Sequence, residues 1–555
     1  MKSKIYLLIL MGALFAVNGC QTPDELLPPV ARAGINSVTA AFEDKSAEFT
    51  ALVTEGVYDI VIPIPYYFPE TSDNQVTNAM LSRMKMRADV DDNVYIDPPL
   101  LFLDLTPGKV HTITVTDQRK GQKQYTIRSE IRKSAACAIE EFVIPLLGDA
   151  TMTGIITEST KTISLLTPDV LAPCTATVRL SPHATISPDP RTTLIDYNTN
   201  QTFTVTAHDG TTATYTVKKE LPAKRAKGIR PESAKLIFVK TAAEIGANSA
   251  NYNGIAVTGD RIVISSRAAA SKVIDAFTGA QLPDLDVTHT AAGLPNFYNT
   301  ADAAGNVLMS DLYNTGSVGT FAMWRIDPVA GTINNYITWT AAPRQIGRKI
   351  SIAGSIDGNA IITAPLHGTD DHSFARWRVI NGALVSQTPD IVTISGDFLW
   401  ANNGSDIIYS SADPQSDYFA VGYKGSASTS SNKLVRIDGT TNTVAAALDP
   451  VTDNTVVAAL DYIEFNNAKY VAFTYARNTT GNEKVYLVDV EEPLSGTPGE
   501  AAIWEITNTY GAGSGNGNST SDIVLKASAD GDYLYLYYYF TNGAIVCYQF
   551  DTYDI

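Results

Sequence analysis

HTITVTDQRKGQKQYTI (residues 111–127) and QTFTVTAHDGTTATYTV (residues 201–217) decide the fold class of this chain. The two segments align without gaps at an offset of 90 residues, 201 against 111. Each alternates Thr with Val, Ile or Phe on both sides of a polar turn, which is typical of a β-hairpin. We therefore predict that each segment ends one copy of a repeated β-module.

The same offset fixes the extent of the modules. VYIDP (94–98) corresponds to ATISP (184–188), again 90 residues apart. A period near 90 residues with about seven short strands is typical of an immunoglobulin-like sandwich. We predict module 1 at 34–133 and module 2 at 138–220. LPAKRAKGIRPES (221–233) is rich in Pro, Gly and basic residues and is predicted to be a linker.

Beyond residue 233 a different hairpin pattern repeats. Six segments share the order strand, Gly/Asn/Asp turn and stronger strand: 254–266, 299–311, 350–364, 399–411, 463–475 and 525–539. A second apolar hairpin follows most of them, at 272–282, 324–336, 377–385 and 435–448. Asp275, Asp327 and Asp438 begin the turns of these second hairpins, where a carboxylate can accept backbone N–H groups.

Two hairpins per unit make a four-stranded blade, so residues 234–555 are predicted to form a six-bladed β-propeller. Seven blades are the alternative, because 412–430 and 488–520 have room for further strands. AKLIFVK (234–240) is expected to complete the last blade with the C-terminal strands. The predicted fold class is therefore all-β: two immunoglobulin-like sandwiches followed by a propeller.

Composition narrows the function. The chain has 555 residues, 18% of them charged, and a formal net charge of -17. An acidic chain without a large basic face argues against a nucleic-acid partner. No P-loop, EF-hand loop, G-x-S-x-G or H-E-x-x-H motif is present, so no cofactor and no catalytic residue is predicted. Cys137 and Cys174 are a candidate disulfide pair that spacing alone does not decide, and Cys547 is expected to be buried.

The N-terminus predicts export and a lipid anchor. Lys2 and Lys4 precede an apolar run from Ile5 to Val17, which is the length of a signal-peptide core and too short to span a bilayer. Val17-Asn18-Gly19-Cys20 resembles the bacterial lipobox, in which the cysteine receives a diacylglycerol and becomes the new N-terminus. We therefore predict a signal peptide at 1–19 and a lipidated Cys20 with its tether at 20–33. An ordinary secretory signal with a chance cysteine is the alternative.

Two groups of titratable residues are candidates for chemistry. HGTDDH contains His367, Asp370, Asp371 and His372, which suits a metal site, but a polar turn between blade strands explains it as well. Propeller hydrolases draw carboxylates from several blades toward the centre, and Asp302, Asp461 and Asp522 are the candidates by position. Nothing in the sequence distinguishes these three from turn residues. We favour the turn interpretation in both cases and predict no metal ligand.

A binding surface is predicted where loops lead into the innermost blade strands. Aromatic rings there could stack on sugars while amides and charges bond hydroxyl groups. The alternative is that the rings cap blade cores, as most propeller aromatics do. The candidate ligand-binding residues are Tyr252, Asn253, Phe297, Tyr298, Asn299, Arg348, Lys349, Trp400, Asp461 and Tyr462.

The order of lipobox, acidic pair (Asp24 and Glu25), two hairpin-repeat modules and propeller is similar to a family of uncharacterised Bacteroidales surface lipoproteins. TVTAHDGTTATYTV (204–217) also resembles the spacer modules of Sus-type glycan-binding lipoproteins. The acidic pair behind Cys20 resembles the export signal of Bacteroidota surface lipoproteins. The resemblance implies an outer-membrane, lipid-anchored protein displayed at the cell surface.

Three functions fit these predictions. The favoured one is a non-catalytic recognition or scaffold protein whose propeller binds a glycan or another cell-surface component. The first alternative is a propeller glycoside hydrolase or polysaccharide lyase. The second is a structural surface-layer or adhesion protein. The expected partners are the outer membrane, through the lipid anchor, and a polysaccharide or a surface protein.

Overall fold

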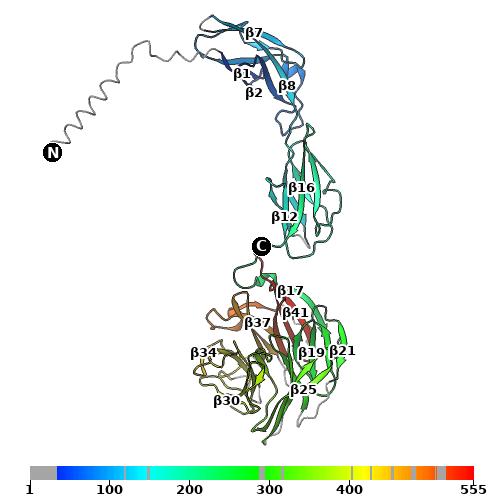
Figure 1. The fold of residues 1–555 in the computed structure, drawn as a ribbon, viewed down its shortest axis with the longest axis vertical. Helices are drawn as coiled ribbons and strands as arrows, with labels where there is room; N and C mark the ends of the chain where they lie inside the picture. Colours follow the sequence, from blue (N-terminus) through cyan, green and yellow to red (C-terminus); the bar gives the residue numbers. More distant parts are fainter. Residues whose placement is uncertain are drawn as a thin grey trace, which may run out of the picture. The chain divides into compact units, whose positions relative to one another are not determined.

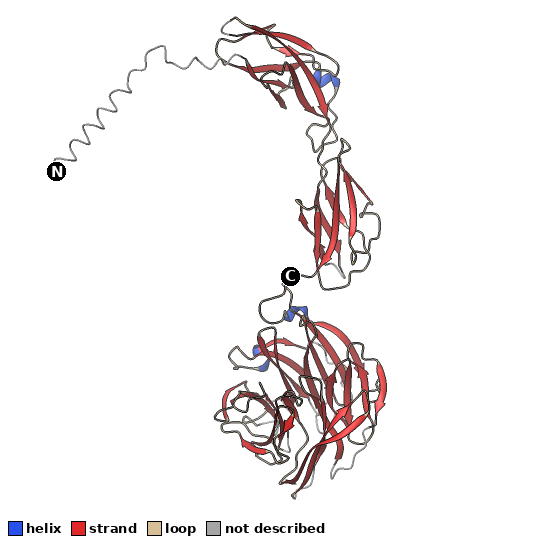
Figure 2. Cartoon of the chain, viewed as in Figure 1, coloured by secondary structure: helices blue, strands red, loops and turns tan. Residues whose placement is uncertain are grey.

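The computed structural model describes residues 34–554 except 118–119, 147–149, 287–293, 314–317, 402–403, 425–427, 452–455, 477–482, 507, 509 and 511–520. The regular structure of these residues is almost all β-strand (Figures 1 and 2). Its helices are single turns: α2 (Asn78–Leu81), α3 (Pro498–Ala501) and a 3-10 turn at Pro231–Ser233. The chain divides into unit 1, Met1–Leu221, and unit 2, Pro222–Ile555. Cys20 and its surroundings lie outside the described residues.

The first half of unit 1 has two four-stranded sheets, in the orders β2-β1-β4-β6 and β3-β8-β7-β5. Their inward side chains, among them Val38, Ile62 and Ile127, form one shared core, so the sheets pack face to face. The strands are β1 (Ile35–Ala41), β2 (Glu48–Leu52), β3 (Asp59–Pro65), β4 (Met84–Val90), β5 (Tyr95–Asp97), β6 (Phe102–Leu103), β7 (His111–Thr116) and β8 (Gln122–Arg132).

The second half of unit 1 repeats this plan. Its sheets have the orders β10-β9-β13 and β11-β12-β16-β15-β14, and Phe142, Phe203 and Tyr215 belong to their common core. The strands are β9 (Ile139–Pro145), β10 (Thr151–Thr153), β11 (Ile155–Thr157), β12 (Thr162–Leu166), β13 (Thr177–Leu180), β14 (Thr185–Ser187), β15 (Gln201–Thr206) and β16 (Thr212–Glu220).

The two predicted hairpins are confirmed. Ile113 faces Tyr125 across β7 and β8, and Phe203 faces Tyr215 across β15 and β16. All four side chains are buried, because the alternation of Thr with apolar residues turns one face of each hairpin to the core. Cys137 and Cys174 are free thiols in this structure, and Cys547 is buried as expected.

Unit 2 contains six sheets among its described residues, and five of them follow the chain as antiparallel meanders. The first sheet contains β18 (Tyr252–Thr258), β19 (Arg261–Ser266), β20 (Ser271–Asp275) and β21 (Gln281–Leu285), and the second contains β22 (Leu294–Ala301), β23 (Val307–Leu312), β24 (Gly319–Asp327) and β25 (Thr332–Ala342). The third contains β26 (Ser351–Gly354), β27 (Ala360–Pro365), β28 (Ser373–Ile380) and β29 (Ala383–Leu384), and β30 (Asp390–Thr393) pairs with β28. The next two are β31 (Ser405–Tyr409), β32 (Tyr418–Gly422), β33 (Leu434–Asp438), β34 (Thr443–Ala447); and β35 (Val456–Phe465), β36 (Ala468–Ala476), β37 (Lys484–Asp489), β38 (Ala502–Glu505).

The sixth sheet joins the two ends of unit 2. It has the order β17-β41-β40-β39, with β39 (Ser521–Ala527), β40 (Tyr533–Phe540), β41 (Ala544–Asp551) and β17 (Lys235–Thr241). Val239 of β17 faces Val546 of β41, so the expected pairing of residues 234–240 with the C-terminal strands is confirmed. Arg230 adds a two-point ion pair to Asp551, with N–O distances of 3.1 and 2.7 Å.

The first strands of the six sheets lie next to one another. β18 contacts β22, β22 contacts β26, β26 contacts β31, β31 contacts β35, and β35 contacts β39. β39 contacts β18 in turn. Among them, β18 and β31 are buried along nearly their whole length, as expected for strands covered on both faces.

The structure corrects one predicted hairpin and explains the two long gaps. Residues 399–411 are not a hairpin: Trp400 bridges to Asp371 instead, and the strand β31 begins only at Ser405. The partner of β31 is β32, inside the gap at 412–430, and β38 lies inside the gap at 488–520. The predicted role of the turn carboxylates is confirmed, because Asp275, Asp327 and Asp438 each accept two backbone N–H groups.

Candidate functional site

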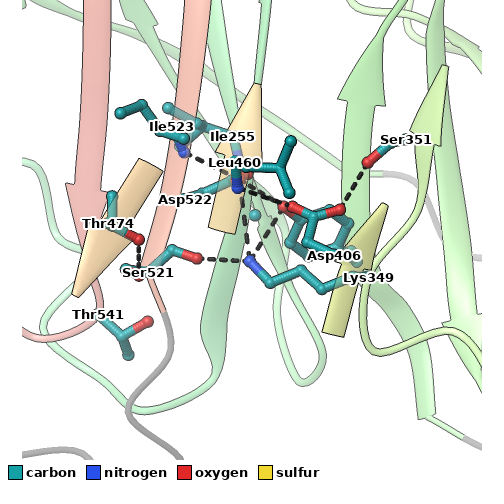
Figure 3. Close-up of polar contacts among 12 residues, drawn as sticks. Ile255, Lys349, Ser351, Asp406, Leu460, Thr474, Ser521, Asp522, Ile523 and Thr541 are labelled. Carbon is teal, nitrogen blue, oxygen red and sulfur yellow. Dashed lines mark hydrogen bonds and ion pairs between the residues drawn. The ribbon is translucent and has the colours of Figure 1, made fainter. Parts of the chain in front are cut away.

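Three aspartates link neighbouring sheets of unit 2 through hydrogen bonds. Each of them lies on the first strand of its sheet. Asp406 of β31 accepts the backbone N–H of Leu460 at 3.2 Å, and Asp461 of β35 accepts that of Leu525 at 2.7 Å. Asp522 continues the series. It accepts the N–H of Ile255 in β18 at 2.7 Å (Figure 3). Each carboxylate thus joins one first strand to the next, and the third joins β39 to β18.

Each of these aspartates also bonds its own strand. Asp406, Asp461 and Asp522 accept the N–H of the residue that follows them, at 3.0, 2.8 and 3.0 Å. Ser351 Oγ donates a further hydrogen bond to Asp406 at 2.6 Å. Every one of the six carboxylate oxygens therefore has at least one donor.

Lys349 supplies the cation among these carboxylates. It lies two residues before β26, and its side chain is only 6% exposed. Its Nζ lies 2.5 Å from the carbonyl oxygen of Ser521, 3.1 Å from the hydroxyl of Tyr298 and 3.9 Å from Asp522 Oδ1 (Figure 3). The Tyr298 hydroxyl also donates to Asp522. We call Tyr298, Lys349, Asp406, Asp461 and Asp522 the hub.

Burial dominates the electrostatics of the hub. It raises the pKa of Asp522 to about 6 and that of Asp461 to about 7, and it raises the pKa of Asp406 as well. Burial lowers the pKa of Lys349, although the carboxylates of Asp522 and Asp406 oppose this shift. The charge of Lys349 thus offsets part of the electrostatic repulsion among the three aspartates of the hub, which water reaches poorly.

Two further cations, Arg348 and Arg267, lie near the starts of the first strands. Arg348 precedes Lys349, and Arg267 follows β19 next to Asn251, which precedes β18. Arg267 Nε donates to Asn251 Oδ1 at 2.9 Å. We call the side of unit 2 on which the first strands begin the strand-start face.

Of the ten predicted ligand-binding residues, the structure brings Tyr298, Lys349 and Asp461 into the hub. Seven are buried: Tyr252, Asn253, Phe297, Tyr298, Asn299, Lys349 and Trp400. Arg348, Asp461 and Tyr462 are half-buried. Asn253 and Asn299 use their amides on backbone carbonyls, at 3.3 Å from Phe297 O and 2.9 Å from Val263 O.

The aromatic candidates serve the cores between sheets. Trp400 is fully buried, donates its Nε1–H to Leu366 O at 2.8 Å and packs on Phe398. Tyr462 stacks on Phe419, with ring centroids 5.6 Å apart. Tyr298 is held inside the hub. The rings of Trp400 and Tyr298 are therefore enclosed, whereas that of Tyr462 is half-buried.

The remaining aspartate candidates are bonded to other residues of unit 2. Asp302 accepts the N–H groups of Ala304, Asn306 and Ile356, the last from the neighbouring sheet. Asp371 pairs with Arg344 at 2.5 Å, and Asp370 pairs with Lys424. Within the described ranges, no three His, Cys, Asp or Glu side chains are grouped closely enough to hold a metal ion.

Sequence reasoning missed Asp406, although the sequence contains a signal for it. Ser405-Asp406-Ile407 and Ser521-Asp522-Ile523 are the same tripeptide at the start of a first strand, and both aspartates fasten the next sheet. Leu460-Asp461-Tyr462 places its aspartate before an aromatic residue instead. An alignment of first strands on this aspartate would have predicted the hub.

Comparison with known families divides the chain into three matched segments, each described only as a domain of unknown function. DUF5018 matches residues 15–129, DUF8499 matches residues 139–219 and DUF8500 matches residues 237–551. No curated protein matches the chain. Among the residues that the structure describes, no helix is long and apolar enough to cross a bilayer.

Two solved structures from Bacteroides are similar in part. A DUF4623 family protein from Bacteroides eggerthii is 14% identical, with a TM-score of 0.46, covering 75% of this chain and 98% of its own. A structural-genomics protein of unknown function from Bacteroides thetaiotaomicron is 12% identical, with a TM-score of 0.35, covering 83% of this chain and 99% of its own.

Proposed function

The chain belongs to the DUF8500 family, and from the geometry of its described residues we propose that it is a non-catalytic recognition or scaffold protein of the bacterial cell surface. In this proposal Cys20 is lipidated and anchors the chain in the outer membrane. The paired sheets of unit 1 are two immunoglobulin-like spacers. Unit 2 is a six-bladed β-propeller that binds a glycan or another cell-surface component at its strand-start face.

The observation that carries the non-catalytic part is that every carboxylate oxygen of the hub already accepts a hydrogen bond from within the protein. A general acid or base needs a free lone pair or proton that reaches the substrate. All six carboxylate oxygens of Asp406, Asp461 and Asp522 already accept hydrogen bonds, three of them from the backbone of a neighbouring sheet. These acids are therefore engaged in holding the sheets together.

The propeller interpretation rests on the order of contacts. Six consecutive sheets, each touching the next through its first strand and the last touching the first, is the arrangement of radially repeated blades. The pairing of β17 with β41 supports it, because it draws both ends of the repeat into one sheet. Propellers offer the ends of their innermost strands as a binding face, and in unit 2 that face carries Arg348 and Arg267.

An enzyme remains the second candidate because of one contact. The Tyr298 hydroxyl lies 3.1 Å from Lys349 Nζ, and burial lowers the pKa of that lysine. A lysine of lowered pKa can act as a general base, while burial and Asp522 raise the pKa of Tyr298, so that this tyrosine would act as the proton donor. A glycoside hydrolase or lyase would need this contact to open toward a substrate, which the closed hub does not offer.

The test combines binding with turnover. The full chain carrying Cys20→Ala, produced without lipid, is run through affinity gels that contain single polysaccharides, and the same mixtures are assayed for new reducing or unsaturated ends. Retention without new ends is the expected result. New ends that disappear in Tyr298→Phe would establish the enzyme. Self-assembly with no retention in any gel would instead favour the structural surface-layer class.

A further inference from the structure

The backbone segment that carries Arg348 and leads into β26 has a fixed conformation. Ile346 pairs on both sides, with Tyr313 and with Leu366. Gly347 has a φ of 102°, and a Cβ on it would lie 2.2 Å from the carbonyl oxygen of Asp311. Only glycine fits there, so the backbone enters β26 along a fixed path. The side chain of Arg348 is therefore presented from a rigid segment.

Among the described residues, no carboxylate forms an ion pair with the guanidinium of Arg348. Its Nε is buried and has no hydrogen-bond partner in the structure. The other charged group that acts on it is the like-charged Arg267, and burial together with this neighbour lowers the pKa of Arg348. A buried donor without an acceptor destabilises the protein, and more so when the donor is charged. Such a cation is suited to an acceptor that arrives from outside.

The other described arginines of unit 2 are each paired with a carboxylate. In the described part of this unit, every arginine except Arg267 and Arg348 lies within 4.0 Å of a carboxylate. The paired arginines are Arg225, Arg230, Arg261, Arg325, Arg344, Arg376, Arg378 and Arg436. The chain has 58 acidic residues and only 41 basic ones, so acids are plentiful. Two arginines side by side without an acid are therefore a local exception.

Lys349 does not share this property. Its ammonium is directed to Asp522, Tyr298 and the carbonyl oxygen of Ser521, so its donors are used inside the hub. Arg267 uses its Nε on Asn251, and among the described residues its side chain has no carboxylate partner. The uncompensated positive charge of the strand-start face thus belongs to the arginine pair.

We propose that Arg348 and Arg267 form an anion site on the strand-start face that binds the carboxylate or sulfate groups of an acidic polysaccharide. The proposal rests on the recognition function proposed above and names its ligand class. A planar guanidinium binds carboxylate and sulfate oxygens in pairs, which gives both strength and orientation. The amide of Asn251 beside Arg267 provides a polar neighbour for sugar hydroxyls.

The experiment uses the full Cys20→Ala chain, four polysaccharides in two matched pairs, and polyglutamate as an acidic peptide polymer. Polygalacturonate is compared with its carboxyl-reduced form, and dextran sulfate with dextran. The variants are Arg348→Gln, Arg267→Gln and the charge-matched control Arg378→Gln, whose arginine lies on β28 at 4.0 Å from Asp390 of β30. Thermal unfolding of each variant verifies that it is folded.

We expect retention by one or both charged polymers and none by their neutral partners. Arg348→Gln should weaken binding roughly tenfold to a hundredfold, since it removes charge-assisted hydrogen bonds, while Arg378→Gln leaves binding unchanged. Arg348→Lys should restore only part of the affinity, because an ammonium lacks the paired donors. Sulfate-only or carboxylate-only binding would identify the group.

Three results would overturn the anion site. Equal binding of charged and neutral polymers, unaffected by Arg348→Gln, would contradict the site while leaving glycan recognition standing. Binding of polyglutamate as tight as that of polygalacturonate would move the ligand class to acidic peptides. Failure of the folded chain to bind any polymer would contradict glycan recognition as well.

Discussion

The carboxylate of Asp522 in β39 accepts the backbone N–H of Ile255 in β18 at 2.7 Å, which links the sixth sheet of unit 2 to the first. The two residues are 267 positions apart in the chain. Asp406 and Asp461 make the corresponding link between earlier sheets. Hydrogen bonds that backbone N–H groups donate to carboxylates are strong because the acceptor is charged. Sheet-to-sheet fastening by aspartate is thus a general device of this unit.

Replacing Asp522 should destabilise unit 2. Asp522→Ala leaves the N–H of Ile255 without its acceptor and removes a carboxylate from beside buried Lys349. We expect a loss of stability on the order of 3 kcal/mol, as for other buried charges deprived of a partner. Chemical denaturation measures it, with the exposed Glu492→Gln as control. Equal unfolding midpoints for the two variants would contradict the fastening role.

The stability of unit 2 should carry a specific pH signature. Burial raises the pKa of Asp461 from 3.8 to about 7, so the folded chain holds this proton more tightly than the unfolded chain. The contribution of Asp461 to stability is therefore present at low pH and falls as pH rises from 3.8 to about 7. Asp461→Asn carries no such proton, so its stability relative to the natural chain should increase over this window. Thermal unfolding at pH 5 and pH 8 tests this, and parallel curves would contradict it.

Trp400 should behave as a core residue. Its ring is fully buried and its indole N–H is bonded to Leu366 O. Trp400→Ala should cost about 3–5 kcal/mol of stability, as large-to-small core substitutions do. Binding, measured at a temperature at which the variant stays folded, should persist. A variant of unchanged stability that loses polysaccharide binding would show that Trp400 contacts the ligand directly.

The anchor makes a separate prediction. Cys20 lies outside the described residues, and its role rests on the lipobox-like sequence before it. Cys20→Ala should move the protein from the membrane fraction to the soluble fraction, because attached acyl chains supply the membrane affinity. Fractionation with fatty-acid labelling measures this, and protease treatment of whole cells tests surface exposure. Membrane retention of the unlabelled variant would contradict lipid anchoring.

Local periodicity made much of the fold predictable. Alternation in 111–127 and 201–217 predicted both hairpins of unit 1, and the Asp-led turns of unit 2 were recognisable from three residues. The failure at 399–411 has a physical cause. A polar run that includes Gly404 follows Trp400 and resembles a hairpin turn, but the backbone of Trp400 pairs with Asp371 of the preceding sheet. A backbone pairing between residues this far apart produces no periodic pattern in the local sequence.

The hub was harder to predict than the strands. Tyr298, Lys349 and Asp461 were chosen by their positions before or within first strands, and they converge with Asp522 because six strands meet. The contact of Tyr298 with Asp522 spans 224 positions and that of Lys349 with Ser521 spans 172, so no local pattern encodes them. Burial was the other unpredictable property. Position suggested open rings at Tyr252, Phe297 and Trp400, whereas packing between adjacent sheets encloses them.

The most direct test of the account is to measure retention and turnover on the same polysaccharide with the same full chain. The account predicts that the Cys20→Ala protein is retained by an acidic polysaccharide, that Arg348→Gln weakens the retention, and that no new chain ends appear over prolonged incubation. Steady release of new reducing or unsaturated ends, abolished by Tyr298→Phe or Lys349→Met, would contradict the non-catalytic function and make the hub an active site.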